Sequence, residues 1–185
     1  MAGVSAHRPW NSTAKRLVDA VAEFDPIWVE DVVRKGSLDA YARLAAASDV
    51  PLCVSERLIG EYEFAQAIET GAVDVVMPDL CWTGGLSAGK GIAKLAETNH
   101  LPVAPHNSGG PVLHRANAHL SAAIPNLYVM EAIRDRYDGW HRNLVTDPLS
   151  VTDGTLPLPE GPGLGTEFDT SLFDRDDVTV RRTTA

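Results

Sequence analysis

The stretch PLCVSERLIGEYEFAQAIETGAVDVVMPD, residues 51–79, decides the fold class of this chain. It predicts an apolar strand over Leu52–Ser55, a helix over Glu61–Glu69 and a second apolar strand over Val73–Met77. Gly71 stands where a glycine is expected after the end of a helix. Two strands joined by a helix of this length run parallel, because a parallel return needs about a dozen or more connecting residues.

The same strand and helix unit repeats along the chain, and helix and strand alternate five times. Ser37 predicts an N-cap for one helix, and the glycine pairs Gly84-Gly85 and Gly109-Gly110 open two others. The expected helices cover residues 14–24, 38–45, 61–69, 86–98 and 111–123, and the expected strands cover 26–29, 52–55, 73–77, 103–104 and 126–130. We therefore expect an α/β fold with a parallel sheet.

A doubly wound open sheet is the competing architecture. Its nucleotide-binding form carries a glycine-rich turn after the first strand, and this sequence has none there. The pairs Gly84-Gly85 and Gly109-Gly110 allow two interpretations: backbone N–H groups at a helix start that meet an anion, or tight loops that need positive φ.

An ionisable residue follows each expected strand: Glu30, Glu56, Asp79, His106 and Glu131. The C-terminal ends of the strands form the side of a (β/α) barrel where active sites are built. Glu30 and Glu56 are the natural pair of oxygen ligands for a hard cation such as Mg²⁺. His106 is suited to take or give a proton, and Asp79 is expected to hold its imidazole in one tautomer.

The other polar and aromatic residues give weaker indications of a catalytic or binding role. Asp31 follows Glu30 directly, so alternation predicts that it points away from the site and serves as a salt-bridge or capping group. His114 and His119 fall within a helix and are expected on its outer side, and His100 and His141 carry no motif. The four tryptophans are interpreted as packing residues or a pocket wall.

Composition limits the function classes. The chain has 185 residues, 44% of them hydrophobic, and a net charge of −9, which argues against nucleic acid and anionic membranes as partners. The two cysteines, Cys53 and Cys81, show no metal-type spacing and no disulfide framework. With no leader peptide and no apolar run of membrane length, we expect a cytoplasmic protein.

After Glu131 the alternation of strand and helix patterns ends, and the sequence becomes rich in aspartate and proline. Asp153-Gly154 predicts a short hairpin, and the last residues, Arg175–Ala185, are polar. We divide the chain at residues 7–145 for the partial barrel, 146–170 for a C-terminal segment and 171–185 for a polar tail.

Five motifs in order resemble the C-terminal barrel of the enolase superfamily, mandelate racemase subgroup. They are Trp28-Val-Glu-Asp31, Ser55-Glu-Arg57, Met77-Pro-Asp-Leu80 with Gly84-Gly85, Ala104-Pro-His-Asn107 and Val129-Met-Glu131. The tail from Asp153 to Asp169 is similar to that of the acid-sugar dehydratases. The resemblance covers about residues 7 to 170 and implies strands 4 to 8 of a TIM (β/α)₈ barrel, with residues 146–170 returning to a capping domain.

The resemblance implies a Mg²⁺ enzyme that abstracts the proton α to a carboxylate. It implies that Glu30 and Glu56 are metal ligands, that His106 and Asp79 form a catalytic dyad, and that Glu131 hydrogen-bonds the substrate carboxylate. For a dehydratase, His106 would also protonate the departing β-hydroxyl or assist at the α-carbon.

The sequence departs from the family pattern at its start. The capping domain and the first two strands have no counterpart, because the chain begins at about the end of the third strand, and Ser5 stands where members carry an aspartate that is the remaining metal ligand. His7 aligns where members have asparagine or, in some dehydratases, a histidine that acts as general acid. We expect weak Mg²⁺ binding and little activity from this chain alone, because two ligands remain and an open barrel arc leaves two sheet edges exposed.

The function expected from the resemblance is a sugar-acid dehydratase, a carbon–oxygen lyase, acting on a sugar acid or another α-hydroxy carboxylate. A racemase or epimerase of the same superfamily is a second reading, because the missing second strand would carry the residue that separates the two. A non-catalytic barrel fragment that serves as a structural module is a third. A homo-oligomer is expected by analogy with the superfamily.

Overall fold

The structure is a computed structural model that describes residues 3–5 and 11–184. Its chain divides into two compact units, which are described separately. The first unit contains residues up to His106 together with Leu120–Glu131, and the second contains Asn107–His119 and the residues after Glu131.

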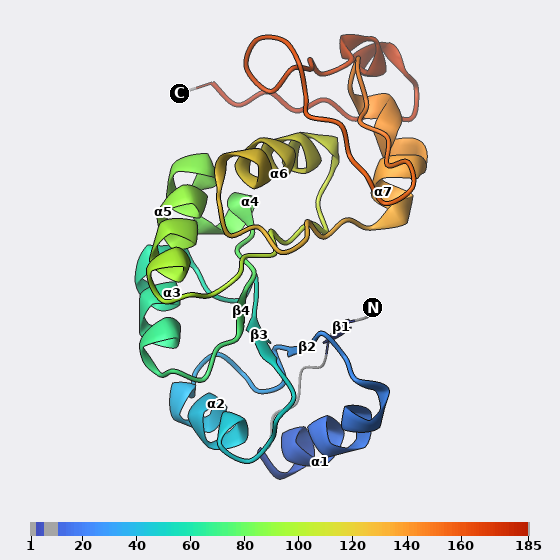
Figure 1. The fold of residues 1–185 in the computed structure, drawn as a ribbon. Helices are drawn as coiled ribbons and strands as arrows, with labels where there is room; N and C mark the ends of the chain where they lie inside the picture. Colours follow the sequence, from blue (N-terminus) through green and yellow to red (C-terminus); the bar gives the residue numbers. More distant parts are fainter. Residues whose placement is uncertain (1–2, 6–10, 185) are drawn as a thin grey trace. The chain divides into compact units, whose positions relative to one another are not determined.

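The first unit contains the sheet and most of the helices (Figure 1). Its strands are β1 (Gly3–Ser5), β2 (Trp28–Glu30), β3 (Leu52–Val54) and β4 (Val75–Val76). Its helices are α1 (Asn11–Val21), α2 (Leu38–Ala45), α3 (Gly60–Glu69), α4 (Leu80–Thr83) and α5 (Gly85–Thr98), with a 3₁₀ turn over Ala22–Phe24. Helix α6 (Pro111–Ala123) starts in the second unit and ends in the first.

The strands form one parallel sheet in the order β1-β2-β3-β4. The register pairs Val29 with Leu52 and Cys53 with Val75, and helices α2, α3 and α5 lie along one side of β2, β3 and β4 (Figure 1). This arrangement confirms the predicted α/β fold with a parallel sheet.

Two expected strands are reduced to single bridges. Val103 pairs in parallel with Val76 and with Leu127, but neither 103–104 nor 126–130 forms a full strand. Pro102 and Pro105 flank this position, and proline has no N–H to donate to a sheet ladder. Both segments therefore continue the parallel pairing after β4, but over a shorter length than expected.

Helix α3 shows how local sequence sets an element. The Glu63 carboxylate accepts a hydrogen bond of 2.8 Å from the backbone N–H of Ile59, which has no partner inside the helix. Two acidic residues in the first turn favour the positive end of the helix dipole. Gly71 follows the helix end with φ of 65°, as predicted for a C-terminal glycine.

Other expectations at helix ends were wrong in detail. Ser37 does precede α2, but its side chain makes no capping hydrogen bond. The four-residue helix α4 was not predicted, whereas β1 coincides with the strand end expected near Ser5. Gly84 and Gly85 have φ of 113° and 85°, which supports the tight-loop interpretation of that pair.

Five buried side chains of the first unit form one hydrophobic cluster. Trp28, Cys53, Val75, Met77 and Ala104 are all buried and pack together. The Trp28 ring also lies 6.0 Å from the ring of Tyr128, tilted by 59°. Burial raises the pKa of the Cys53 thiol well above its usual value, so this cysteine packs as a neutral side chain.

The second unit contains the start of α6, α7 (Arg134–Asp138) and 3₁₀ turns over Trp140–Leu144 and Thr170–Asp174. Arg115 is completely buried and donates hydrogen bonds to the carbonyls of Leu164 (3.1 Å) and Gly165 (2.7 Å), besides pairing with Asp147. Gly165 has φ of 73°, and a Cβ there would clash with the backbone oxygen of Glu160. The loop therefore depends on both residues.

The predicted hairpin is present in this unit. Thr152 and Thr155 exchange backbone hydrogen bonds of 2.9 and 2.8 Å. Asp153 and Gly154 between them have φ of 50° and 73°, and positive φ at both central positions is the requirement of a type I′ turn.

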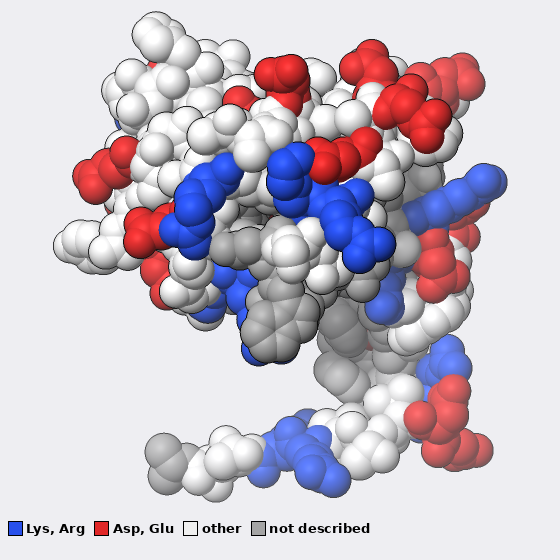
Figure 2. Space-filling view, turned by 90° about the horizontal axis from the view of Figure 1, so that it is seen from below, with Lys and Arg blue, Asp and Glu red and all other residues white. Residues whose placement is uncertain are grey.

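Surface charge is mixed on the face drawn in Figure 2, where Lys and Arg side chains lie beside Asp and Glu side chains. Exposed pairs include Lys15 with Asp19 at 2.7 Å and Lys35 with Glu63 at 3.2 Å. In the part of the chain that the structure describes, no helix has the length and apolar character needed to cross a bilayer.

Candidate active site

The backbone ladder of the first unit continues past the ends of the strands. The N–H of Met77 donates to Val54 (2.9 Å), that of His106 to Pro78 (3.1 Å) and that of Glu131 to Pro105 (3.1 Å). These hydrogen bonds join segments that run parallel to one another. The residues that follow the strands therefore lie together at one edge of the sheet.

His106 lies at the centre of this edge and is only 8% exposed. Its Nδ1 is 2.7 Å from Oδ2 of Asp79. Its Nε2 is 3.7 Å from Oε2 of Glu56 and 3.6 Å from Oε2 of Glu131. The structure thus brings together four of the residues predicted from strand ends.

Both oxygens of Asp79 are engaged. Oδ1 accepts a hydrogen bond of 2.8 Å from the backbone N–H of Cys81, so Asp79 is the N-cap of α4, and Oδ2 accepts from His106. An ionised carboxylate can only accept, so the proton in this contact is on Nδ1 of the imidazole. Nε2 therefore faces Glu56 and Glu131, and a proton exchanged by this ring would move at Nε2.

The environment raises the pKa of His106 above its usual value of 6.5. Burial lowers this pKa because it disfavours the charged imidazolium, but the hydrogen bond with Asp79 and the negative charges of Glu131 and Glu56 outweigh it. The imidazolium form of His106 therefore persists to a higher pH than in a histidine with the usual pKa.

Replacing Asp79 with asparagine is expected to lower the pKa of His106. The substitution removes the negative charge that favours the imidazolium and replaces a carboxylate acceptor with a weaker amide oxygen, while burial, which lowers the pKa, stays. The ring resonances of His106, followed by NMR as pH is varied, should show half-protonation at a lower pH in Asp79→Asn than in the wild type. An unchanged titration would break the assignment of a His106–Asp79 dyad.

A second cluster of acidic groups lies beside His106. One oxygen from each of Glu30, Asp31 and Glu56 lies within 4.8 Å of the others. Burial, together with the negative charges of Asp31, Glu131 and Glu56, raises the pKa of Glu30 to about 7. The cluster therefore holds more negative charge than its surroundings compensate.

A hard divalent cation fits this cluster. Its donors are carboxylate oxygens, the ligands that Mg²⁺ prefers, and a cation would remove the repulsion that raises the pKa of Glu30. Glu30 and Glu56, predicted as the ligand pair, both belong to it.

Asp31 differs from its expected orientation. Its φ is 46°, in the left-handed region, so the alternation of an extended strand does not apply beyond Glu30. Its carboxylate accordingly lies near those of Glu30 and Glu56 and does not point away from them. Its expected role as a salt-bridge group is confirmed by a contact of 3.2 Å with Nε of Arg57.

The remaining predicted residues lie elsewhere. His7 is outside the described residues, and Ser5 is described by its backbone, which pairs in register with Glu30. The expectation of an outer-helix histidine is wrong for His114, which is buried, accepts a hydrogen bond of 2.9 Å from Asn107 and stacks on Tyr137.

Sequence reasoning missed the contacts of Ser55 and Arg57. Both flank Glu56, and both hold the Asp31 carboxylate through contacts that join residues more than 20 positions apart. The signal was present in the quoted motif Ser55-Glu-Arg57, but spacing alone does not show which partner such side chains meet.

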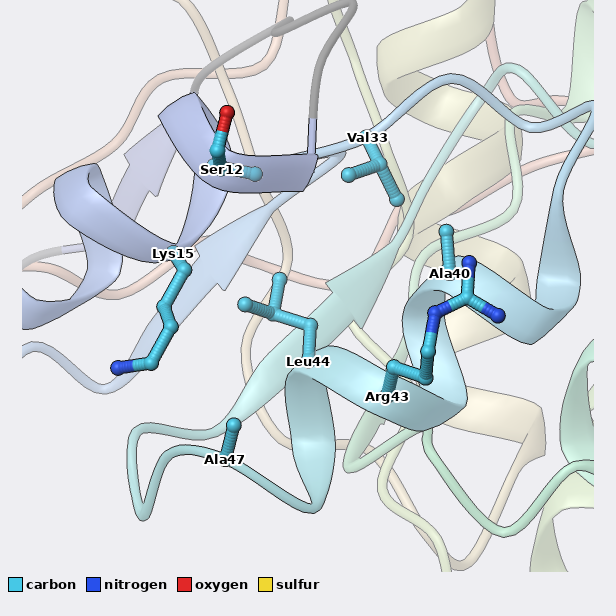
Figure 3. Close-up of a pocket in the computed structure, with 8 residues that line it drawn as sticks. Ser12, Lys15, Val33, Ala40, Arg43, Leu44 and Ala47 are labelled. Atoms are coloured by element: carbon cyan, nitrogen blue, oxygen red, sulfur yellow. The ribbon is translucent and has the colours of Figure 1, made fainter.

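A hollow of about 260 Å³ between α1 and α2 is a different kind of feature (Figure 3). Its walls are mainly apolar, with a few polar side chains at the margin: Ser12, Ala14, Lys15, Val33, Ala40, Arg43, Leu44 and Ala47. None of these residues belongs to the carboxylate cluster or contacts His106. The strand-end residues therefore remain the candidate site.

Comparison with known families matches residues 2–172 to the family described as enolase C-terminal domain-like. The chain is 28% identical over 173 residues to a D-gluconate dehydratase of Thermoproteus tenax, covering 93% of the chain and 35% of that relative. It is 33% identical to a D-xylonate dehydratase of Haloferax volcanii (86% and 39%) and 35% identical to a D-galactarolactone cycloisomerase of Agrobacterium fabrum (83% and 42%). The chain thus spans less than half the length of these relatives.

Solved structures show the same similarity. An enolase of the mandelate racemase subgroup from Agrobacterium tumefaciens matches with a TM-score of 0.86 and 38% identity, over 93% of this chain and 48% of that one. An enolase protein from Sargasso Sea environmental sequencing matches with a TM-score of 0.87 and 33% identity, over 97% and 49%.

Proposed function

The chain belongs to the enolase C-terminal domain-like family, and from this premise we propose that it carries part of the active site of a Mg²⁺-dependent sugar-acid dehydratase. The observation that supports the proposal best is His106, with Nδ1 held by Asp79 at 2.7 Å and Nε2 facing the carboxylates of Glu56 and Glu131. Two of the relatives compared above are dehydratases of D-gluconate and D-xylonate, which supports a sugar acid as the substrate class.

His106 is the proposed proton-transfer group. In a dehydration the C–H bond next to the carboxylate breaks, the β C–O bond breaks, and the hydroxyl leaves as water after gaining a proton. Nε2 of His106 takes the α-proton or gives a proton to the departing hydroxyl, and Asp79 keeps Nδ1 protonated so that Nε2 is available. Glu131, of which 37% of the side chain is exposed, is the proposed hydrogen-bonding partner of the substrate carboxylate.

Glu30 and Glu56 are the proposed Mg²⁺ ligands. When bound, the cation supplies positive charge that stabilises negative charge developing on the substrate carboxylate. The two glutamates extend from neighbouring strand ends, where β2 pairs with β3, and this shared edge supports their assignment as a pair.

We further propose that the parallel sheet is an arc of a (β/α)₈ barrel, about strands 4 to 8, and that residues 146–170 return to a capping domain. The chain spans 35% to 42% of the relatives named above, so residues that close over a substrate would be supplied outside it. A soluble cytoplasmic homo-oligomer is part of the same proposal, by analogy with the superfamily.

A second candidate function has one observation in its favour. The relative with 35% identity is a cycloisomerase, so similarity over this part of the chain does not separate dehydration from other reactions that start at the same α-proton. Racemisation and epimerisation belong to this group of reactions. The candidate function without catalysis is a purely structural role for the fragment.

The test is a product assay on the full chain with Mg²⁺ and a panel of D-gluconate, D-xylonate and D-galactonate in D₂O. A dehydratase yields a 2-keto-3-deoxy acid, detected by derivatisation of the new ketone. Exchange of the α-proton for deuterium without a keto product would favour a racemase or epimerase. No product, no exchange and no change of melting temperature with Mg²⁺ would favour the structural role.

A further inference from the structure

We propose that Asp31 is a positioning residue that fixes the Glu56 carboxylate by holding the residues on both sides of it. This inference rests on the proposed function, because it concerns the cation site to which Glu30 and Glu56 are assigned. Asp31 itself is assigned no ligand role: its oxygens are already occupied by groups of the protein.

The contacts of Asp31 bracket Glu56. Its Oδ1 accepts from the backbone N–H of Ser55 at 3.2 Å, and its Oδ2 lies 2.7 Å from the Ser55 hydroxyl, whose single proton is shared between this oxygen and Oε2 of Glu56. Oδ2 also lies 3.2 Å from Nε of Arg57. The same carboxylate thus contacts residue 55 through its backbone N–H and its hydroxyl, and pairs with residue 57 as an ion pair.

Asp31 lies where it can hold the ends of β2 and β3 in a fixed geometry. It is 3% exposed, and it follows Glu30, the last residue of β2, so one buried side chain links the two strand ends that carry the proposed ligands. Buried hydrogen bonds to a charged group are strong and directional. A φ of 46° in a residue other than glycine is costly, and it turns this carboxylate toward the Ser55-Glu56-Arg57 segment.

Tyr41 offers a matched control. Its hydroxyl lies 3.4 Å from Oδ1 of Asp31, but Tyr41 belongs to α2 and touches neither neighbour of Glu56 through this contact. Tyr41→Phe therefore removes a buried polar contact of the same carboxylate without releasing the Glu56 segment.

The experiment is a titration of the full chain with Mn²⁺, which takes the same hard oxygen ligands as Mg²⁺ and reports its free concentration by electron paramagnetic resonance. Asp31→Asn is the main variant, since asparagine tolerates the left-handed conformation but cannot pair with Arg57 as a carboxylate does. We expect its Kd for Mn²⁺ to rise by about 10- to 100-fold, the usual effect of losing a group that orients a ligand. Tyr41→Phe should keep the Kd of the wild type.

Melting temperatures measured without metal distinguish a positioning role of Asp31 from a role in folding stability alone. A drop in melting temperature with an unchanged Kd in Asp31→Asn would overturn the inference and leave Asp31 a structural residue. If Asp31→Asn does not fold, Arg57→Gln carries the same test, because the Arg57 side chain is 38% exposed and its loss opens little of the core. A Kd equal to that of the wild type in Arg57→Gln would then overturn the inference.

The proposed function fails in a different way. If the wild type binds no Mn²⁺, both the cation site and the inference fall. If the wild type binds Mn²⁺ and Glu56→Gln does not, while Asp31→Asn binds as the wild type, only the inference falls.

Discussion

Replacing His106 with asparagine is expected to reduce α-proton exchange and dehydration by about two to four orders of magnitude, the usual contribution of a general acid–base group. Asparagine is small enough for the buried site and can still hydrogen-bond to Asp79, but it cannot exchange a proton near neutral pH. The measurement is deuterium incorporation at the α-carbon and keto-acid formation from a sugar acid that the wild type accepts.

The matched control for this variant is His100→Asn. His100 is an exposed histidine with φ of 58°, a conformation that asparagine accepts readily, and it lies outside the carboxylate cluster. It should keep both activities. If His106→Asn turned over substrate at the rate of the wild type, the proton-transfer group would have to be sought in another residue.

The helices were predictable from sequence because their ends carry local chemical signals. Gly71 after α3 has φ of 65°, a conformation that few other residues adopt, and α6 begins directly after the glycine pair Gly109-Gly110, so both helices begin and end close to the expected positions. Helix α4 was not predicted, because four residues are too few to show the hydrophobic periodicity of a helix. Its N-cap is Asp79.

The strand-end residues were predictable for a related reason. In parallel units the chain delivers the residue after each strand to the same edge, so sequence position alone brings Asp79, His106 and Glu131 into one region. The contacts of Asp31 were not predictable, because a single residue with positive φ reverses the direction that alternation assigns to its side chain. Its partners Ser55 and Arg57 are joined to it only by the tertiary fold.

Replacing Glu56 with glutamine is expected to remove the stabilisation of the chain by Mg²⁺. Binding at about 100 times Kd stabilises a folded protein by about 2.7 kcal/mol, which for a chain of this size raises the melting temperature by about 5 to 10 °C. Glutamine has nearly the same shape but carries no charge, so it leaves Glu30 as the only strong ligand of the proposed pair. The measurement is the melting temperature with and without Mg²⁺ at constant ionic strength.

Glu69→Gln is the control for the loss of one negative charge. Glu69 is exposed at the end of α3 and belongs to neither cluster of the candidate site, so this variant should keep the full Mg²⁺ shift of the wild type. Because the chain has a net charge of −9, general screening by a divalent cation would raise the melting temperatures of both variants equally. A shift lost only in Glu56→Gln therefore assigns the cation to the strand ends, whereas a shift kept in both variants would place it elsewhere on the surface.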